Sequence, residues 1–357
     1  MAASSNVAEP TDNSKVFMTN DKFGLPVNMA GMHDTPAISP EHKALTHDLL
    51  KQLPKVLILD DLEASLTGEL GANLSELNTP DAIAAGIAQS VADLAADNVV
   101  YAELRFSPEL HTDGGLTLQE AVDCAITGVE AAHRAHPNVD TRLILNASRA
   151  GGVLDDVAAL AVSMSGPIIV GFSVSGDQER HSLAPHAEAF RALRENYVAF
   201  SIQSGLDAGI ESVGEAIQLG ATRLGNAPRL VDDFGVDMEG IVPGKISAWV
   251  RDRHLTVETA PSVEAQRGAA EQLGDHPLPL LQQLGFTCTV NTGDRSVTSL
   301  TEQFLALTET FGYGPEEFFD LTVNAVEAAF LNQEQRQHLL ETVILPAYEE
   351  LADPVEE

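Results

Sequence analysis

Residues 82–106 have the sequence AIAAGIAQSVADLAADNVVYAELRF, and this stretch shows the pattern on which the whole chain is built. Its first part, Ala82–Ala96, is rich in alanine and has the length of a helix. Its second part, Val99–Phe106, is a mostly apolar run, which is typical of a strand buried on both faces. A helix that leads directly into such a strand indicates a parallel sheet made of βα units.

The same alternation recurs along the chain from Lys55 onward. Eight segments have the apolar character of buried strands: Val56–Leu59, Val99–Phe106, Arg142–Ala147, Ile168–Val174, Val198–Gln203, Arg223–Asn226, Leu255–Thr259 and Phe286–Asn291. Segments of helical length separate most of them, including Gln119–His133, His186–Glu195 and Glu211–Leu219. Eight βα units in 357 residues predict an α/β fold of the (β/α)8 TIM-barrel type.

The ends of the chain depart from this rhythm. Residues 1–50 are mostly polar and without a clear period, so we expect an N-terminal tail there and a barrel domain over residues 51–357. Pro315–Leu331 and Gln333–Leu351 predict extra C-terminal helices. Residues 60–81 are short for a βα connection and polar, so the first connection is expected to be abbreviated.

Composition limits the possible partners. The net charge is −33, from 53 acidic and 20 basic residues, which disfavours binding to nucleic acid or to a membrane surface. Hydrophobic residues make up 44%, enough to bury a large core. The two cysteines, Cys124 and Cys288, form no disulfide framework, and no signal peptide or membrane span is visible, so a cytoplasmic protein is expected.

Reactive groups of a parallel barrel lie at the carboxyl ends of its strands. None of the eleven histidines falls at such an end, so a histidine-based metal cluster is not expected. Carboxylates do occur there: Asp60, Asp61, Glu63, Asp177, Asp207 and Asp294. Oxygen ligands alone suit Mg²⁺ or Ca²⁺, which leaves a hard-metal site open as an alternative.

Six segments, in order, resemble motifs of the bacterial adenosine deaminases. Residues 98–111, NVVYAELRFSPELH, resemble the second-strand motif of that family, and residues 171–177, GFSVSGD, are similar to G-F-D-[LI]-A-G. Residues 223–233 resemble R-[IL]-G-H-G-x-R-[LI]-V-D-D, and residues 258–269 resemble E-x-C-P-x-S-N-x-Q-x-G-A. Residues 290–295 and 322–330 are similar to [VL]-N-T-D-[ND]-x and to T-x-N-A-x-x-x-A-F. The resemblance implies a (β/α)8 barrel of the metal-dependent hydrolase superfamily.

The resemblance also implies a zinc centre, whose residues differ in this chain. At the four family positions that ligate zinc stand Leu59, Asp61, Gln203 and Gly293. Leu206 replaces the glutamate that shuttles protons, and Asn226 replaces the histidine that orients the attacking water. Leucine and glycine offer no ligating side chain, and an amide is a poor zinc ligand, so we expect no zinc cofactor. The abbreviated first connection further predicts a barrel mouth open to water.

Three positions retain a possible ligand-binding character. The resemblance places Gly176 and Asp294 beside the purine ring and Glu63 near the sugar. The sequence therefore predicts a pseudoenzyme that binds a protein partner or a purine nucleoside without deaminating it. The alternative is an enzyme with zinc-independent hydrolytic chemistry that uses the carboxylates Asp61, Glu63, Asp207 and Asp294.

Overall fold

The computed structural model describes residues 47–67, 74–238 and 240–352, which belong to one compact unit, Leu45–Glu357. Most of the predicted tail, residues 1–50, lies outside these residues. A helix over residues 47–52 already belongs to the described part, so the body begins slightly before the predicted boundary.

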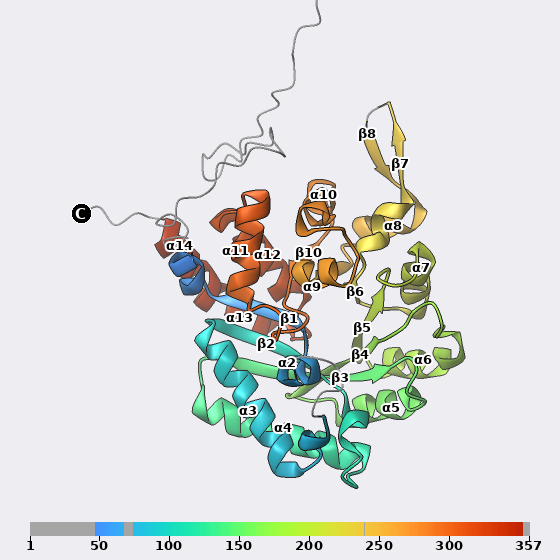
Figure 1. Ribbon diagram of the computed structural model, residues 1–357, viewed down its shortest axis with the longest axis vertical. Helices are drawn as coiled ribbons and strands as arrows, with labels where there is room; N and C mark the ends of the chain where they lie inside the picture. The colour runs from blue at the N-terminus through green and yellow to red at the C-terminus, as the bar shows by residue number, and fades with distance from the viewer. Residues whose placement is uncertain (1–46, 68–73, 239, 353–357) are drawn as a thin grey trace, which may run out of the picture. The chain divides into compact units, whose positions relative to one another are not determined.

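Eight parallel strands form one sheet in the order β1-β2-β3-β4-β5-β6-β9-β10, with helices around it (Figure 1). The strands are β1 (Lys55–Asp61), β2 (Val99–Phe106), β3 (Asp140–Ser148), β4 (Ile169–Ser175), β5 (Ala199–Ser204), β6 (Arg223–Asn226), β9 (Thr256–Thr259) and β10 (Cys288–Val290). All eight predicted strands are confirmed, and so is the predicted TIM-barrel class.

The strands are connected mainly by helices. These are α2 (Leu62–Thr67), α3 (Pro80–Ala96), α4 (Leu118–Ala135), α5 (Leu154–Met164), α6 (Ala187–Glu195), α7 (Ile210–Leu219), α8 (Lys245–Asp252), α9 (Pro261–Gln266) and α10 (Leu278–Gln283). After β10 follow α11 (Leu300–Phe311), α12 (Pro315–Ala328), α13 (Gln333–Leu339) and α14 (Leu345–Ala352). The last predicted helix is thus divided, because a π-helical turn over Leu340–Ile344 interrupts it. No helix within the described ranges is long and apolar enough to cross a membrane.

Local sequence explains where several helices begin. The Thr117 side chain accepts a hydrogen bond from the Glu120 backbone N–H at the start of α4, and the Glu120 carboxylate accepts one from the Thr117 N–H. Ser299 and Glu302 form the same reciprocal pair at the start of α11. Each pair satisfies backbone donors that the first helical turn leaves unbonded.

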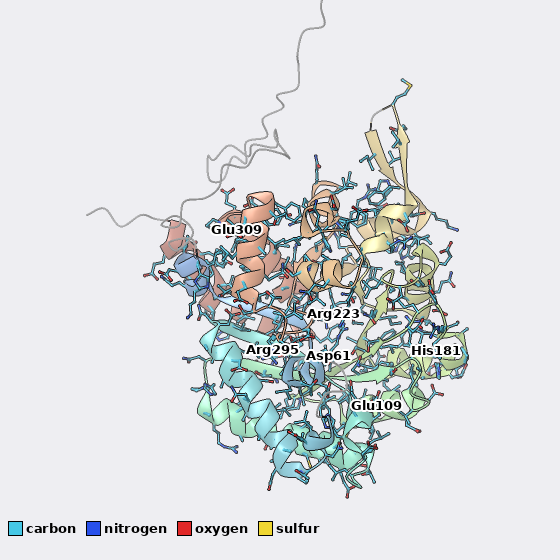
Figure 2. The ribbon with its side chains drawn as sticks, in the orientation of Figure 1. Asp61, Glu109, His181, Arg223, Arg295 and Glu309 are labelled. Atoms are coloured by element: carbon cyan, nitrogen blue, oxygen red, sulfur yellow. The ribbon has the colours of Figure 1, made fainter. Side chains whose placement is uncertain are left out.

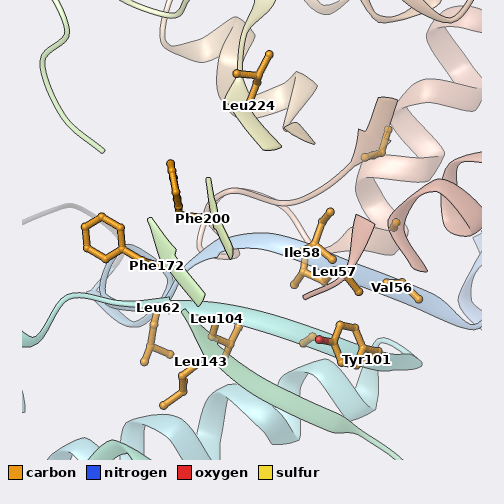
Figure 3. Packing of buried hydrophobic residues seen from close by; sticks show 14 of the residues in the cluster. Val56, Leu57, Ile58, Leu62, Tyr101, Leu104, Leu143, Phe172, Phe200 and Leu224 are labelled. Carbon is orange, nitrogen blue, oxygen red and sulfur yellow. The ribbon is translucent and has the colours of Figure 1, made fainter. Parts of the chain in front are cut away.

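The strands carry the core. Apolar side chains from successive strands, including Leu57, Leu104, Leu143, Phe172 and Leu224, are fully buried (Figure 3). These apolar side chains pack between the strands and the helices, whereas the barrel interior holds buried polar groups such as Glu103, Arg105 and Ser201.

The barrel interior also contains four buried charges. Arg223 forms ion pairs of 2.7 Å with both Glu103 and Glu258, and Arg105 contacts Glu258 at 2.8 Å. Two positive and two negative side chains balance, which offsets the cost of removing them from water.

The seam between β10 and β1 closes the barrel without a regular ladder. The backbone N–H of Gly293 donates to the Leu59 carbonyl, and the Asp61 N–H donates to the Gly293 carbonyl, both at 3.0 Å. The Asn291 side-chain oxygen accepts from the N–H groups of Ile58 and Leu59 at 3.0 and 3.1 Å. A side chain therefore supplies part of the pairing that a backbone strand would otherwise provide.

Two features differ from the sequence-based expectations. The first βα connection is not simply a polar loop, because it contains α2, whose first three residues are buried. A two-stranded antiparallel hairpin, β7 (Phe234–Asp237) and β8 (Gly240–Pro243), follows β6 and was not predicted. Its strands, FGVD and GIVP, each contain a glycine and are mostly exposed, so they lack the buried apolar run that marks the barrel strands.

Candidate functional site at the carboxyl end of the barrel

The positions singled out by the sequence lie at or just beyond the carboxyl ends of β1, β5, β6 and β10. Leu59, Gln203, Leu206 and Asn226 are all buried, with at most 9% of any of them exposed. These four side chains are therefore shielded from solvent, and the openness of the mouth as a whole stays a prediction.

One side of the mouth is apolar. Leu59, Ala260 and Val263 form a small hydrophobic cluster separate from the main core. Gly293 lies against it with φ +67°, and a Cβ built there would lie 3.0 Å from the Ala260 Cβ and 3.4 Å from Leu59. Leu59 and its neighbours thus occupy the space into which a side chain at position 293 would point.

The other side of the mouth is a chain of hydrogen bonds. The Gly176 N–H donates to the Gln203 side-chain oxygen at 2.9 Å, and the Gln203 amide nitrogen donates to the Asn226 oxygen at 3.1 Å. The Asn226 amide nitrogen donates in turn to the Glu264 carboxylate at 2.9 Å. Gln203 and Asn226 are therefore bound to each other, to Gly176 just after β4 and to Glu264 on α9, so both amides have partners within the protein.

Glu264 and His276 complete this chain. The Glu264 carboxylate also accepts from the Ala260 N–H at 2.6 Å and from His276 Nε2 at 2.9 Å. His276 Nδ1 accepts from the Leu278 N–H, which leaves the proton on Nε2 and makes a neutral imidazole the donor. The four side chains of this hydrogen-bonded series, Gln203, Asn226, Glu264 and His276, thus all have a partner in the protein.

Glu63 forms a second buried cluster with His111. The Glu63 carboxylate accepts from the Ser107 N–H at 2.9 Å and from His111 Nε2 at 3.0 Å, while His111 Nδ1 donates to the Leu77 carbonyl at 2.8 Å. Burial alone lowers the pKa of His111, but the hydrogen bond and charge of Glu63 outweigh burial and raise it. Both ring nitrogens face acceptors, an arrangement that favours the imidazolium.

Asp61 is the last residue of β1 and lies near the centre of the view in Figure 2. Its carboxylate accepts from the Ala64 N–H at 2.9 Å. Burial, followed by the negative charge of Glu63, raises the pKa of Asp61 to about 7. Among the mouth carboxylates, Asp61 therefore changes its charge near neutral pH.

Asp60, its neighbour, points the other way, as expected for adjacent strand residues. It is buried and pairs with Arg295 at 2.8 Å while accepting hydrogen bonds from the hydroxyls of Ser65 and Thr292. Asp60 therefore serves the structure of the β1–β10 seam.

Asp294 and Leu206 also have partners within the protein. The Asp294 carboxylate accepts from the Ser296 N–H at 2.9 Å and from the Ser296 hydroxyl at 2.6 Å, as in a local turn. The Leu206 N–H donates to the Gln178 side chain at 3.2 Å. Within the described ranges, no three His, Cys, Asp or Glu side chains are grouped so that they could hold a metal ion.

Seven of the residues singled out by the sequence fall into three sets. Leu59 and Gly293 lie on the apolar side of the mouth. Gln203, Asn226 and Gly176 form its hydrogen-bonded side, and Glu63 and Asp61 are neighbouring acidic residues. Glu264, His276 and His111 were missed as members of the mouth. Glu264 stands at the asparagine position of the motif over residues 258–269, and that departure was the available signal.

A parallel eight-stranded barrel with polar groups at its carboxyl end defines the class of protein as a TIM barrel. Comparison with known proteins identifies the family. The family model described as Adenosine deaminase matches residues 60–346. An adenosine deaminase of Mycobacterium ulcerans is 38% identical over 280 residues, which cover 76% of this chain and 77% of the relative. The chain belongs to the adenosine deaminase family.

Other relatives agree with this assignment. An adenosine deaminase of Mycobacterium marinum is likewise 38% identical, over 76% of this chain and 77% of the relative. An amidohydrolase of Burkholderia ambifaria, solved with bound zinc, has a similar structure, with a TM-score of 0.74 at 19% identity over 90% of this chain and 96% of the other. An adenine deaminase of Arthrobacter aurescens has a TM-score of 0.68 at 18% identity, over 89% of this chain and 90% of the other. At such identities these two structures support the fold alone.

Proposed function

We propose that this chain is a non-deaminating member of the adenosine deaminase family that acts by binding a protein partner. The observation that carries the proposal is the hydrogen-bonded chain from Gly176 through Gln203 and Asn226 to Glu264. It occupies family positions that otherwise ligate zinc and orient water, and its buried polar groups satisfy one another.

The residues present do not fit the family's zinc. Leu59 and Gly293 have no donor atom, and a side chain at position 293 would contact Ala260. Both ends of the Gln203 amide are engaged in hydrogen bonds, so it would have to break them to face an ion. Of the four positions that the resemblance implies as zinc ligands, Asp61 alone carries a carboxylate, and one ligand does not make a tetrahedral zinc site.

Proton transfer lacks its family group as well. Leu206 can neither accept nor donate a proton through its side chain. Glu264 is a carboxylate at the same mouth, but Asn226, Ala260 and His276 take up its oxygens. The geometry therefore favours a stabilising role for Glu264.

Protein binding is favoured over nucleoside binding because the Gly176 N–H, which the resemblance places beside the purine ring, is already bonded to Gln203. A purine that took this N–H would leave the buried Gln203 oxygen unpaired, which costs about 1–3 kcal/mol. Asp294 and Glu63 each use one carboxylate oxygen, and the buried Glu63 Oε2 has no hydrogen-bond partner among the described residues, so Gly176 alone carries this preference.

One observation favours the alternative, zinc-independent hydrolysis. Asp61, whose pKa is raised to about 7, has the acid strength of a general acid or base at neutral pH. Such chemistry needs Asp61 to reach a bound substrate. Activity that is lost in Asp61→Asn would support this second function.

The experiment measures zinc content and deamination on the same purified chain. Elemental analysis should find far less than one zinc per chain, even after zinc is supplied during expression. Adenosine and 2′-deoxyadenosine should yield no inosine products above the uncatalysed background, because ligands and proton shuttle are missing. An active deaminase of the family serves as the positive control.

Stoichiometric zinc that resists chelation would overturn the proposal, as would turnover that persists through repurification. A thermal-shift series with adenosine and inosine tests the binding mode. No shift is expected, whereas a saturable shift would replace the protein partner with a nucleoside.

A further inference from the structure

A cavity of about 160 Å³ lies between α3, the strands β1 and β2, and the segment that leads from β10 into α11. Strand and helix residues together form its apolar walls: Leu57, Leu66, Leu94, Val99 and Leu300. The other lining side chains are polar or charged. None of the lining residues is one that the sequence singled out, so the cavity is distinct from the barrel mouth.

Two polar atoms of the lining residues have no hydrogen-bond partner among the described residues. They are the Ser90 hydroxyl oxygen and Nη2 of Arg295, which is labelled in Figure 2. Ser90 is 1% exposed, and Arg295 Nη1 donates to the Ser90 backbone carbonyl at 3.1 Å, so the two groups are neighbours. Leaving buried polar atoms without partners is costly, and a molecule in the cavity can supply both partners.

The charge of Arg295 is already balanced. Its Nε donates to the fully buried Asp60 carboxylate at 2.8 Å. Nη2 therefore needs an acceptor and not a counter-ion. A hydroxyl meets this need, because its oxygen can accept from Nη2 while its proton or second lone pair serves the Ser90 hydroxyl.

Carboxylates lie on the solvent side of the cavity. Asp93 is exposed and Asp97 is half-buried, and both belong to the lining. Together with Arg295, two carboxylates and one guanidinium give the lining a net charge of −1. Lys55 Nζ donates to the Asp97 backbone carbonyl at 2.8 Å and partly offsets the charge of Asp97, so Asp93 is the stronger attraction for a cation.

Helix geometry sets the distance between the two kinds of group. Ser90 and Asp93 are three residues apart on α3, and residues with this spacing lie on one helix face with about 5–6 Å between their Cβ atoms. A ligand that reaches both needs an acceptor and a cation separated by about the same distance. A cavity of this size accommodates a molecule of about six heavy atoms.

Water alone suits this cavity poorly. About five water molecules fill such a volume, and each needs two to four polar partners. Five apolar side chains line the same space, so part of that water lacks partners. Apolar walls with a few placed polar groups are instead typical of a small-molecule site.

We propose that this cavity binds a small cationic amino alcohol. The hydroxyl accepts from Arg295 Nη2 and shares a hydrogen bond with Ser90, the ammonium group faces Asp93, and the methylene groups contact the apolar walls. The inference goes beyond the proposed function, because this site is separate from the mouth and does not depend on whether the chain deaminates.

The test is a ligand-observed NMR titration of the full chain with four compounds of similar size. Aminobutanol, with its amine and hydroxyl at opposite ends, should bind saturably. Butylamine and butanol each lack one of the two groups and should bind at least about fivefold more weakly. γ-Aminobutyrate should also bind more weakly, because its carboxylate is repelled by Asp60.

Three variants locate the site. Asp93→Asn should weaken the affinity for aminobutanol by roughly two- to fivefold and leave that for butanol unchanged. Ser90→Ala removes one hydrogen bond and should weaken it by roughly two- to tenfold. Ser90→Leu fills the cavity and should abolish binding.

Asp81→Asn is the matched control, since Asp81 is an exposed acid of the same helix that does not line the cavity. It should bind aminobutanol like the wild type. Both asparagine variants alter exposed side chains and should melt at the wild-type temperature, so that weaker binding by Asp93→Asn is not a loss of folded protein.

Aminobutanol that fails to bind saturably would overturn the proposal. So would wild-type affinity in Ser90→Leu, equal losses in Asp93→Asn and Asp81→Asn, or butanol or γ-aminobutyrate that binds as tightly as aminobutanol. Ordered water alone in the cavity of a crystal grown with aminobutanol would overturn it as well. None of these measurements involves zinc or deamination, so failure here and failure of the proposed function are distinguishable.

Discussion

Gly293 shows how one residue can limit what a site holds. Its backbone hydrogen bonds on both sides form the β1–β10 seam, and its φ of +67° lies in the left-handed region that favours glycine. In the family this position carries an aspartate that ligates zinc. Here the chain direction and the neighbouring Ala260 leave little room for a side chain.

Restoring that aspartate should therefore destabilise the fold. For Gly293→Asp we expect a loss of about 2–4 kcal/mol in the free energy of unfolding, from backbone strain, the contact with Ala260 and a carboxylate without a metal. Urea denaturation measures the loss. Gly293→Ala is the control for strain and contact, and it should lose about half as much. Unchanged stability in Gly293→Asp would mean that the seam can open to admit a side chain.

Asp61 provides a pH-dependent prediction. Because its pKa is raised to about 7 in the folded protein, the folded state holds a proton that the unfolded state releases near the ordinary value of 3.8. The stability contribution of Asp61 is therefore greatest below pH 3.8 and is lost as the pH rises through 7.

Asp61→Asn removes this titration while keeping a side-chain oxygen for the Ala64 N–H. At pH 8 the variant should be more stable than the wild type by roughly 1–3 kcal/mol, and the difference should shrink toward pH 4. Denaturation curves at a series of pH values test this, with Asp113→Asn on the surface as the control. A difference that does not vary with pH would show that Asp61 titrates normally.

At the scale of elements, the mouth depends on contacts between βα units that are distant in sequence. Glu264, in α9, binds Asn226 at the end of β6 and His276 ahead of α10. It also accepts from Ala260 at the start of its own helix. One carboxylate therefore connects three consecutive segments of the barrel rim.

Removing that carboxylate should weaken all three connections. Glu264→Leu leaves three buried donors unpaired, and we expect a loss of about 3–5 kcal/mol in the free energy of unfolding. Glu264→Gln keeps one acceptor oxygen for Asn226 and Ala260, so its loss should be roughly half as large. Equal losses in the two variants, measured by urea denaturation, would contradict the hydrogen-bond account and indicate a packing effect.

At the scale of the whole molecule, charge and shape divide the surface into two kinds. The net charge of −33 favours solubility and keeps most faces apart from other acidic surfaces. The hairpin of β7 and β8 exposes apolar side chains, Val236, Ile241 and Val242, on an element anchored at its base.

The sequence by itself determined the order of the elements and the class of the fold. Apolar runs such as Val99–Phe106 and the helices between them depend on local periodicity, which any window of the chain displays. Leu59, Gln203 and Gly293, which the resemblance aligns with zinc-ligand positions of the family, were likewise identified from the motifs around them. The strands of the hairpin were not visible, because each contains a glycine and is mostly exposed, so neither forms a buried apolar run.

Only the tertiary structure decided what fills the barrel mouth. Leu59 packs with Ala260 and Val263, which are distant from it in sequence. Gln203 likewise donates a hydrogen bond to Asn226, which belongs to the next barrel strand. Whether a substituted site is left open or is repacked depends on distances between strand ends that are set by closure of the whole barrel. No single segment contains that information, so the contacts of Glu264 at the mouth could not be predicted without the arrangement of all eight strands.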